Sequence, residues 1–263
     1  MSREKLINTK VKSENAERLQ QLLLDYHNFR YRPDKSLEVP MSELSNWQAA
    51  RLKRTHQDLY TTSRYHQGLE FLLKDLYAPK EFTRRDDDLE RIFPTMVKLL
   101  PDNLLYTVGL LVELNLLTQR LDEQLARVLF NELKINEISE QNYCEAYRLC
   151  NNKALRAHQT QLIANIGDDL DVYVRSRLVR FTLKMTRSPA EMAGLGNLHS
   201  FLRRGFEAFH EMKGVDELLE VIVERETKIL NSIFDNDEAP LNIIMPPETA
   251  TPKAAESPTT YRA

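Results

Sequence analysis

The chain has 263 residues, of which 42% are hydrophobic, so it is long and apolar enough to bury a substantial core. The 36 Lys and Arg residues nearly balance the 39 Asp and Glu residues. The net charge of -3 excludes a chain-wide attraction for polyanions or anionic membranes, so nucleic-acid binding would require a local basic patch.

Glycine is scarce, with 7 residues, which disfavours glycine-rich phosphate loops and favours long helices with short connections. Charges are scattered through the N-terminal residues, and no apolar stretch of a secretory signal is present. Cys144 and Cys150 lie on different faces of a predicted helix, so they are expected to stay unpaired. These features predict a reduced, cytoplasmic protein.

Helical periodicity in the first part of the chain is punctuated by prolines. One helix is predicted over 11–31, where it stops before Pro33, and a second begins near Ser42. A third helix is predicted over 63–77 and ends before Pro79. Proline ends these helices because it lacks a backbone N–H and disfavours helical geometry in the residue before it.

The middle of the chain begins with a capping box, in which Thr83 and Asp86 predict the start of a helix. Pro94 is expected to kink or end that helix. The most apolar segment, 104–117, is shorter than the ~20 residues of a membrane-spanning helix and contains Glu113. It therefore predicts a buried central helix.

In the last part of the chain, Ser188, Pro189 and Glu191 combine an N-cap, a first-turn proline and a capping glutamate. They predict a helix that starts at Ser188, breaks near 194–196 and continues to residue 213. No segment alternates apolar and polar residues as a strand does, so the pattern predicts an all-α protein, a single large multi-helix bundle over residues 1–234. Further helices are predicted over 119–133, 139–150, 153–166, 169–187 and 216–234.

Residues 235–263 form a different segment, in which five of the eleven prolines lie among Thr, Ala, Ser and Glu. Such a composition predicts a flexible, disordered tail. Residues 241–245 interrupt it with an apolar island of Leu241, Ile243, Ile244 and Met245. Because large apolar side chains gain by burial, the island is expected to dock, either on the bundle itself or on another protein.

Two stretches carry a resemblance to a known group of proteins. They are RYHQGLEFLLKDLYAPKEFTRRDDDLERIFP, residues 64–94, and SPAEMAGLGNLHSFLRRGFEAFHEMKG, residues 188–214. Both resemble an uncharacterised family of proteobacterial all-helical proteins. The resemblance implies a helical fold and brings no activity, cofactor or partner with it. Ala78 stands where the family pattern has glycine, which argues against a tight glycine turn there.

Common enzyme motifs such as GxGxxG, GxxxxGK[ST], HExxH and GxSxG are absent from the sequence, so dinucleotide and P-loop enzymes are excluded. His66 with Glu70, and Glu207 with His210, each place two metal-ligand types on one helical face. Together they could hold Fe, Mn or Zn. The competing interpretation is surface pairing, because a di-metal bundle needs the Glu-x-x-His pair twice and this chain has it once.

A polar line runs along the apolar segment, because Asp102, Tyr106, Gly109, Glu113 and Arg120 fall within about 60° on a helical projection. If this line faces inward, Glu113 needs a cationic or hydrogen-bonding partner, since an isolated buried carboxylate would take up a proton. Tyr106 and Arg120 would then line the same polar site. The competing interpretation is that the line is the solvent-facing seam of the helix.

A basic stripe is the best binding signal in the sequence, with apolar Leu178, Phe181 and Met185 beside it. Its members are Arg177, Arg180, Lys184 and Arg187. Helices of this kind meet nucleic-acid phosphates or anionic lipid headgroups. The competing interpretation is that acidic residues 168–171 at the start of the helix and cations at its end simply suit the helix dipole.

A corner near residues 74–91 joins a helix end, a proline and a new helix start. Arg84 and Arg85, with Tyr77 and Asp86, could form a small anion site beside the free N–H groups of the new helix. Alternatively, these charges pair with one another in a capped turn.

These features favour a cytoplasmic binding or regulatory protein that performs no chemistry of its own, uses no cofactor and engages another protein as its partner. Nucleic acid or anionic lipid could be bound through the basic stripe. The alternative is a helical-bundle metal-dependent enzyme or small-ligand carrier with a polar site in the bundle core. The sequence does not indicate the oligomeric state.

Overall fold

The computed structural model describes residues 2–31, 36–72, 82–212 and 215–242, with side chains described for all of these except 2 and 82–86. These residues form thirteen α-helices and one π-helical turn, with no strand among them, which confirms the all-α prediction. The elements are α1 (Ser2–Asn8), α2 (Glu14–Arg30), α3 (Glu38–Thr55), α4 (Gln57–Thr61), α5 (Ser63–Phe71), α6 (Phe82–Leu99), α7 (Asp102–Ala126), η2 (Arg127–Glu132), α8 (Glu140–Leu149), α9 (Lys153–Arg175), α10 (Arg177–Met185), α11 (Arg187–Met192), α12 (Gly196–Met212) and α13 (Val215–Asp235).

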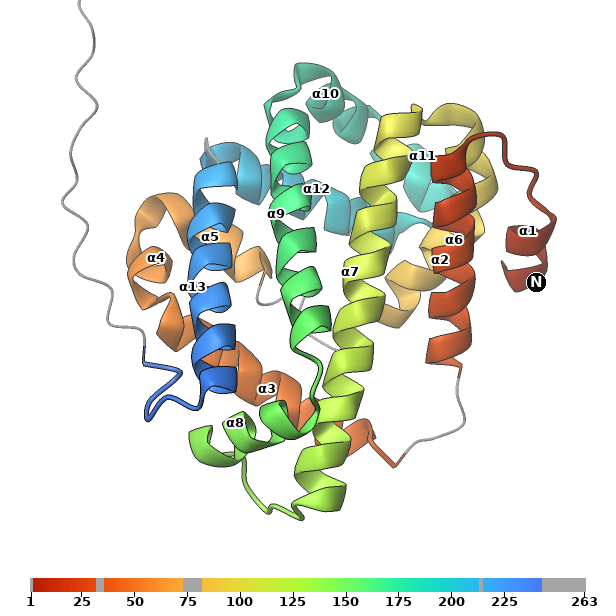
Figure 1. Cartoon of the computed structure of the whole chain (residues 1–263). Helices are drawn as coiled ribbons and strands as arrows, with labels where there is room; N and C mark the ends of the chain where they lie inside the picture. The colour runs from red at the N-terminus through yellow and green to blue at the C-terminus, as the bar shows by residue number, and fades with distance from the viewer. Residues whose placement is uncertain (1, 32–35, 73–81, 213–214, 243–263) are drawn as a thin grey trace, which may run out of the picture.

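Four long helices, α2, α7, α9 and α13, form the central layer, in which each packs against the next. Figure 1 shows them side by side in that order, with α3 crossing the lower ends of α13 and α9 to reach α7, and with α12 lying behind them. α12 packs against α5, α6 and α9, and α1 packs against α2 and α6 at the edge of the layer. The segment 104–117 lies in α7 at the centre, as predicted, with Leu105, Leu110 and Leu116 buried.

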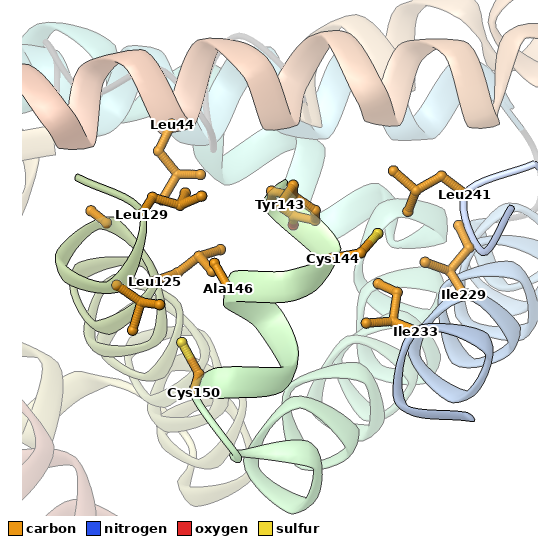
Figure 2. Close-up of a cluster of buried hydrophobic side chains, with 12 residues drawn as sticks. Leu44, Leu125, Leu129, Tyr143, Cys144, Ala146, Cys150, Ile229, Ile233 and Leu241 are labelled. Carbon is orange, nitrogen blue, oxygen red and sulfur yellow. The ribbon is translucent and has the colours of Figure 1, made fainter. Parts of the chain in front are cut away.

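Three main groups of buried side chains hold the layers together. The α2 cluster joins α1, α2, α6 and α7 around Leu19, Leu23 and Phe93. The α12 cluster joins α5, α9, α12 and α13 around Phe209 and Met212. The α8 cluster, drawn in Figure 2, fills the space where the ends of α7 and α13 meet α3 and α8.

Leu241 belongs to the α8 cluster, although it lies beyond the end of α13 in the segment predicted to be a tail. Its side chain is 7% exposed. Figure 2 shows it facing Ile229 and Cys144. The first residue of the apolar island therefore docks on the bundle, which is one of the two alternatives left open by the sequence. The rest of the island, 243–245, lies outside the described residues.

Several helix boundaries in the first half differ from those predicted. α3 begins at Glu38, four residues before Ser42. α6 continues through Pro94 to Leu99, so the proline does not end it. α7 runs unbroken past residue 117, where the sequence suggested separate helices over 104–117 and 119–133. Burial of its apolar face in the central layer stabilises the longer helix, which local signals alone did not indicate.

In the second half, α8 begins where the helix over 139–150 was predicted, and the structure adds a capping box there, in which the Ser139 hydroxyl accepts from the Asn142 N–H at 3.2 Å. α9 extends to Arg175, so the predicted helix over 169–187 is divided between α9 and α10. The predicted helix start at Ser188 is wrong, because α11 begins one residue earlier and its N-cap, Thr186, makes no side-chain cap bond. The predicted break is confirmed by Gly194, whose φ of 68° favours glycine.

Two glycines allow α5 and α12 to approach closely. A Cβ atom added at Gly205 would lie 2.8 Å from Cζ of Phe71, and one at Gly68 would lie 2.7 Å from Cε of Met212. A phenylalanine ring moves as a rigid unit, whereas the end of a methionine side chain bends. The two glycines therefore differ in how strictly the packing requires them.

Candidate binding surface

Helix α10 lies at the end of the molecule where α7 begins and α9 ends (Figure 1). Ser176 caps it by accepting a hydrogen bond from the Val179 N–H at 3.4 Å. Val179 and Leu183 are partly buried against the α12 cluster, so they form the inner face of α10. None of the nine residues of the helix is fully buried.

The outer surface of α10 carries three large apolar side chains, which we call the apolar row. Leu178, Phe181 and Met185 are exposed by 73%, 61% and 61%, respectively. Their spacing of three and four residues places them on one face of the helix. Every other described helix has at most two exposed large hydrophobic residues. The apolar row is therefore the densest exposed apolar feature in the described part of the chain.

The predicted basic stripe lies beside the apolar row on the same helix and continues to the start of α11. All four of its cations, which we call the basic row, are exposed. Arg187 pairs with Glu191 at 3.1 Å, and Nη1 of Arg180 lies 3.5 Å from Nε2 of His210. Among the described residues, no carboxylate forms an ion pair with Arg177, Arg180 or Lys184. α10 thus has three faces, one apolar and inward, one basic and one apolar and exposed.

The helix dipole explains the basic row only in part. Lys184 lies in the last turn of α10, where a helix dipole favours a cation, but Arg177 is the first residue of α10, where a cation is disfavoured. Asp168, Asp169 and Asp171 do not start the helix of the basic row, because they lie near the end of α9. Asp169 accepts from the Thr107 hydroxyl on α7 at 2.6 Å, and Asp171 pairs with Arg175 at 2.7 Å.

The four predicted metal ligands do not converge on one point. His66, Glu70 and Glu207 line a hollow of about 420 Å³ between α5 and α12, together with Phe71 and Arg204. Within the described ranges, no group of three His, Cys, Asp or Glu side chains is arranged to hold a metal ion. Each of the three hollow-lining groups has a neighbour of its own. His66 Nδ1 lies 2.9 Å from the Tyr60 carbonyl, Glu70 accepts from the Tyr60 hydroxyl, and Glu207 accepts from Arg203 at 2.9 Å.

His210, the fourth predicted ligand, points away from this hollow. Its Nδ1 lies 2.6 Å from the Val174 carbonyl, so it donates to α9. Its ring stacks on that of Phe206 with a centroid distance of 5.3 Å. These contacts place His210 between α12 and α9.

The polar line on α7 faces the outside along most of its length, and Asp102, Tyr106 and Arg120 are exposed. Glu113 is partly buried, because α2 and α9 lie on either side of it. It accepts a hydrogen bond from Arg18 on α2, and its Oε1 lies 3.0 Å from Nε2 of His158 on α9. The structure therefore gives Glu113 the cationic and hydrogen-bonding partners that an inward carboxylate needs. Of the other members of the line, Gly109 is buried, and Asp102, Tyr106 and Arg120 lie at the surface.

The side chains of the predicted anion corner lie outside the described residues. Arg84 and Arg85 lie in the first turn of α6, and their side chains are outside the described residues. The same holds for Tyr77 and for the side chain of Asp86.

The sequence did not single out two glutamates that each bind an arginine and a histidine. Glu226 on α13 has both carboxylate oxygens 2.6 Å from Nη1 of Arg51, and its Oε1 lies 3.0 Å from Nε2 of His56. In the same way Glu90 on α6, with a side chain 1% exposed, lies 2.6 Å from Arg30 and 2.9 Å from His27. Each triad links helices that are distant in the sequence.

The neighbour of Glu226 in the sequence makes a second cross-link. Arg225 donates through Nη1 and Nη2 to the two oxygens of Asp58, both at 2.7 Å. A sequence signal for Glu226 did exist, since it lies between Ile222 and Ile229 on the apolar stripe of α13. A charged residue at such a position implies a buried partner, but the pattern does not reveal which one.

The pKa values of these groups follow from their surroundings. Burial raises the pKa of the Glu226 carboxyl, but the charge of Arg51 and hydrogen bonds from His56 and Arg51 outweigh burial and hold it at about 2. The hydrogen bond from Arg225 likewise lowers the pKa of Asp58. Burial raises the pKa of the Cys144 and Cys150 thiols to about 11, and both cysteines are free, as predicted.

The described chain is thus an all-helical protein whose internal charges are paired and whose exposed amphipathic surface lies on α10. No described helix combines the length and apolar character needed to cross a bilayer. A family model, Domain of unknown function (DUF8198), matches residues 28–240, and the chain belongs to this family. The match agrees with the resemblance to an uncharacterised helical family. No curated protein and no solved structure shows a significant match to the chain.

Proposed function

We propose that the protein is a cytoplasmic binding or regulatory protein that performs no chemistry of its own and engages a partner through α10. The observation that carries this proposal is the apolar row, exposed next to the basic row on a helix with no fully buried residue. Large apolar side chains gain free energy when a partner covers them. Arg177, Arg180 and Lys184, which form no ion pair with the described residues, add electrostatic attraction to a partner of opposite charge.

The buried groups support the proposal that the protein performs no chemistry of its own. Buried ionisable groups such as Glu226 and Glu90 are engaged by arginine and histidine side chains that satisfy their charge. The thiols of Cys144 and Cys150 have pKa values of about 11, so the thiolate needed for nucleophilic attack is scarce at neutral pH. These arrangements stabilise a fold and do not prepare a reaction.

A photo-crosslinking experiment tests the proposal. A benzoylphenylalanine residue in place of Phe181 should form an adduct in living cells that produce the protein. The same group in place of Leu99, which is 74% exposed at the end of α6, serves as the control. The Phe181 adduct should disappear when Arg180→Glu and Lys184→Glu are added. If the two positions give the same adducts, or none, the proposed surface is not used.

A second candidate is a small-ligand or metal carrier that uses the hollow between α5 and α12. The hollow is lined by His66, Glu70 and Glu207, although these side chains are not arranged as a metal site. Metal analysis of the purified protein distinguishes the two candidates. Stoichiometric Fe, Mn or Zn that is lost in a Glu70→Gln variant would favour the carrier. Metal content at background level, unchanged by that substitution, would favour the binding protein.

A further inference from the structure

We infer that the partner of α10 is a membrane surface containing anionic phospholipid. This inference rests on the proposed function and names the class of partner. In this arrangement the apolar row enters the boundary between headgroups and acyl chains, and the basic row binds lipid phosphates. Interfacial helices combine these two features, with a basic face beside a face of large apolar residues.

The position of α10 suits a flat partner. The helix lies at one end of the molecule (Figure 1), and its outer side chains are more than 60% exposed. Leu178, Phe181 and Met185 therefore project as a ridge. A protein partner would need a groove complementary to this ridge, whereas a bilayer adapts to it because lipids move aside.

The composition of the surface disfavours nucleic acid as the partner. Proteins that bind single strands stack bases on several aromatic rings, and α10 offers one ring, that of Phe181. Phosphate binding alone would not explain why Leu178 and Met185 are exposed beside the cations. Binding to a lipid surface would involve both the basic row and the apolar row.

The overall charge predicts how this binding should behave. The net charge of -3 provides no long-range attraction to an anionic surface, so the basic row must act at short range. Salt screens such contacts, with a screening length of about 10 Å at 0.1 M and about 3 Å at 1 M. Binding should therefore need anionic lipid and should fall steeply as salt rises.

Vesicle flotation with the full chain tests this inference. The protein should float with phosphatidylcholine vesicles that contain phosphatidylserine, should not float with pure phosphatidylcholine, and should be released by high salt. Arg180→Glu with Lys184→Glu should weaken binding about tenfold or more, since each cation near an anionic surface contributes a severalfold factor. Leu178→Ser should weaken it about threefold to tenfold, in line with the loss of one large apolar side chain.

Two matched controls separate the role of α10 from general effects of charge and exposure. Lys10→Glu with Lys12→Glu changes the net charge equally at exposed positions near the N-terminus. Leu99→Ser removes a leucine that is 74% exposed, compared with 73% for Leu178. Both controls should bind vesicles within about twofold of the original chain, and all variants should keep its melting temperature.

Three results would overturn the inference. The chain could fail to float with anionic vesicles, or the control variants could lose binding as much as the α10 variants. It could also bind a duplex or single-stranded oligonucleotide through Arg180 and Lys184 while ignoring vesicles. If vesicles do not bind but the Phe181 crosslink in cells persists, the proposed function stands and its partner is not lipid. If vesicles do not bind and the Phe181 crosslink is also absent, the proposed function is refuted as well.

Discussion

Glu226 is the residue whose substitution tests most directly how the fold is held together. In a Glu226→Gln variant the side chain keeps its shape, so the packing stays filled, but Arg51 loses its negative partner. The Arg51 side chain is 9% exposed and cannot recover its hydration without unfolding. Removal of one partner from a buried pair costs about 3–5 kcal/mol. For a chain of this size, that cost lowers Tm by roughly 10 °C.

The pKa of Glu226 gives a second, independent value for the free-energy cost of Glu226→Gln. Its value falls from 4.5 to about 2 on folding, and each unit is worth 1.36 kcal/mol, so the charged form contributes roughly 3 kcal/mol. A lowered carboxyl pKa means that this stability is fully present above pH 4.5 and is lost as the pH falls towards 2. The difference in stability between the original chain and the Glu226→Gln variant should therefore be large at pH 7 and shrink between pH 4.5 and 2.

Urea unfolding, followed by circular dichroism at 222 nm between pH 7 and pH 3, measures this difference. Glu224→Gln is the matched control, because Glu224 is an exposed neighbour on α13 that pairs with Lys228. This control should leave the free energy of unfolding nearly unchanged at every pH. The reasoning is refuted if Glu226→Gln costs less than about 1 kcal/mol at pH 7. A difference that stays constant from pH 7 to pH 3 would refute the pKa argument in particular.

Three further predictions concern packing and thiol chemistry. Leu241→Ala should lower the free energy of unfolding by about 2–3 kcal/mol, because it removes a buried side chain from the α8 cluster; an unchanged urea midpoint would show that the segment after α13 does not contribute. Gly205→Ala should destabilise by about 1–3 kcal/mol, whereas Gly68→Ala should be nearly neutral, because its Cβ meets a flexible side chain; equal shifts in Tm would contradict this. Cys144 and Cys150 should react with a thiol reagent at pH 8 only at the rate at which local or global unfolding exposes them. Rapid labelling of the native protein would contradict their raised pKa values.

Local signals in the sequence predicted the helices well where the decisive residues lie next to one another. The start of α8 after Ser139 and the break at Gly194 depend on hydrogen bonds or backbone angles within a few residues. Predictions failed where packing outweighs local preference. Pro94 does not end α6, one of the two outcomes expected of it, because Phe93 and Met96 beside it are buried in the α2 cluster. The residues around 117 continue α7, because that helix buries its apolar face in the central layer.

The surface site on α10 was predicted only in part, because local spacing is visible in the sequence and packing is not. The spacing of the basic row and apolar row on one helix can be read from the sequence. Their exposure could not be read, because it depends on the chain turning at Ser176 and on which face of α10 meets the α12 cluster. The triads around Glu226 and Glu90 were missed because each joins partners far apart in the chain, by 175 residues between Arg51 and Glu226.

The charges on α13 also restrict how the first and last thirds of the chain align. Arg225 and Glu226 are consecutive, so they point about 100° apart and meet two different anchors, Asp58 and Arg51. If α13 slid by one turn, Ile222 would lie where Glu226 lies now, and four charges would lose their partners. Purely apolar faces would tolerate such a shift far better. These ion pairs therefore select one register for the last helix and penalise compact states in which it docks out of place.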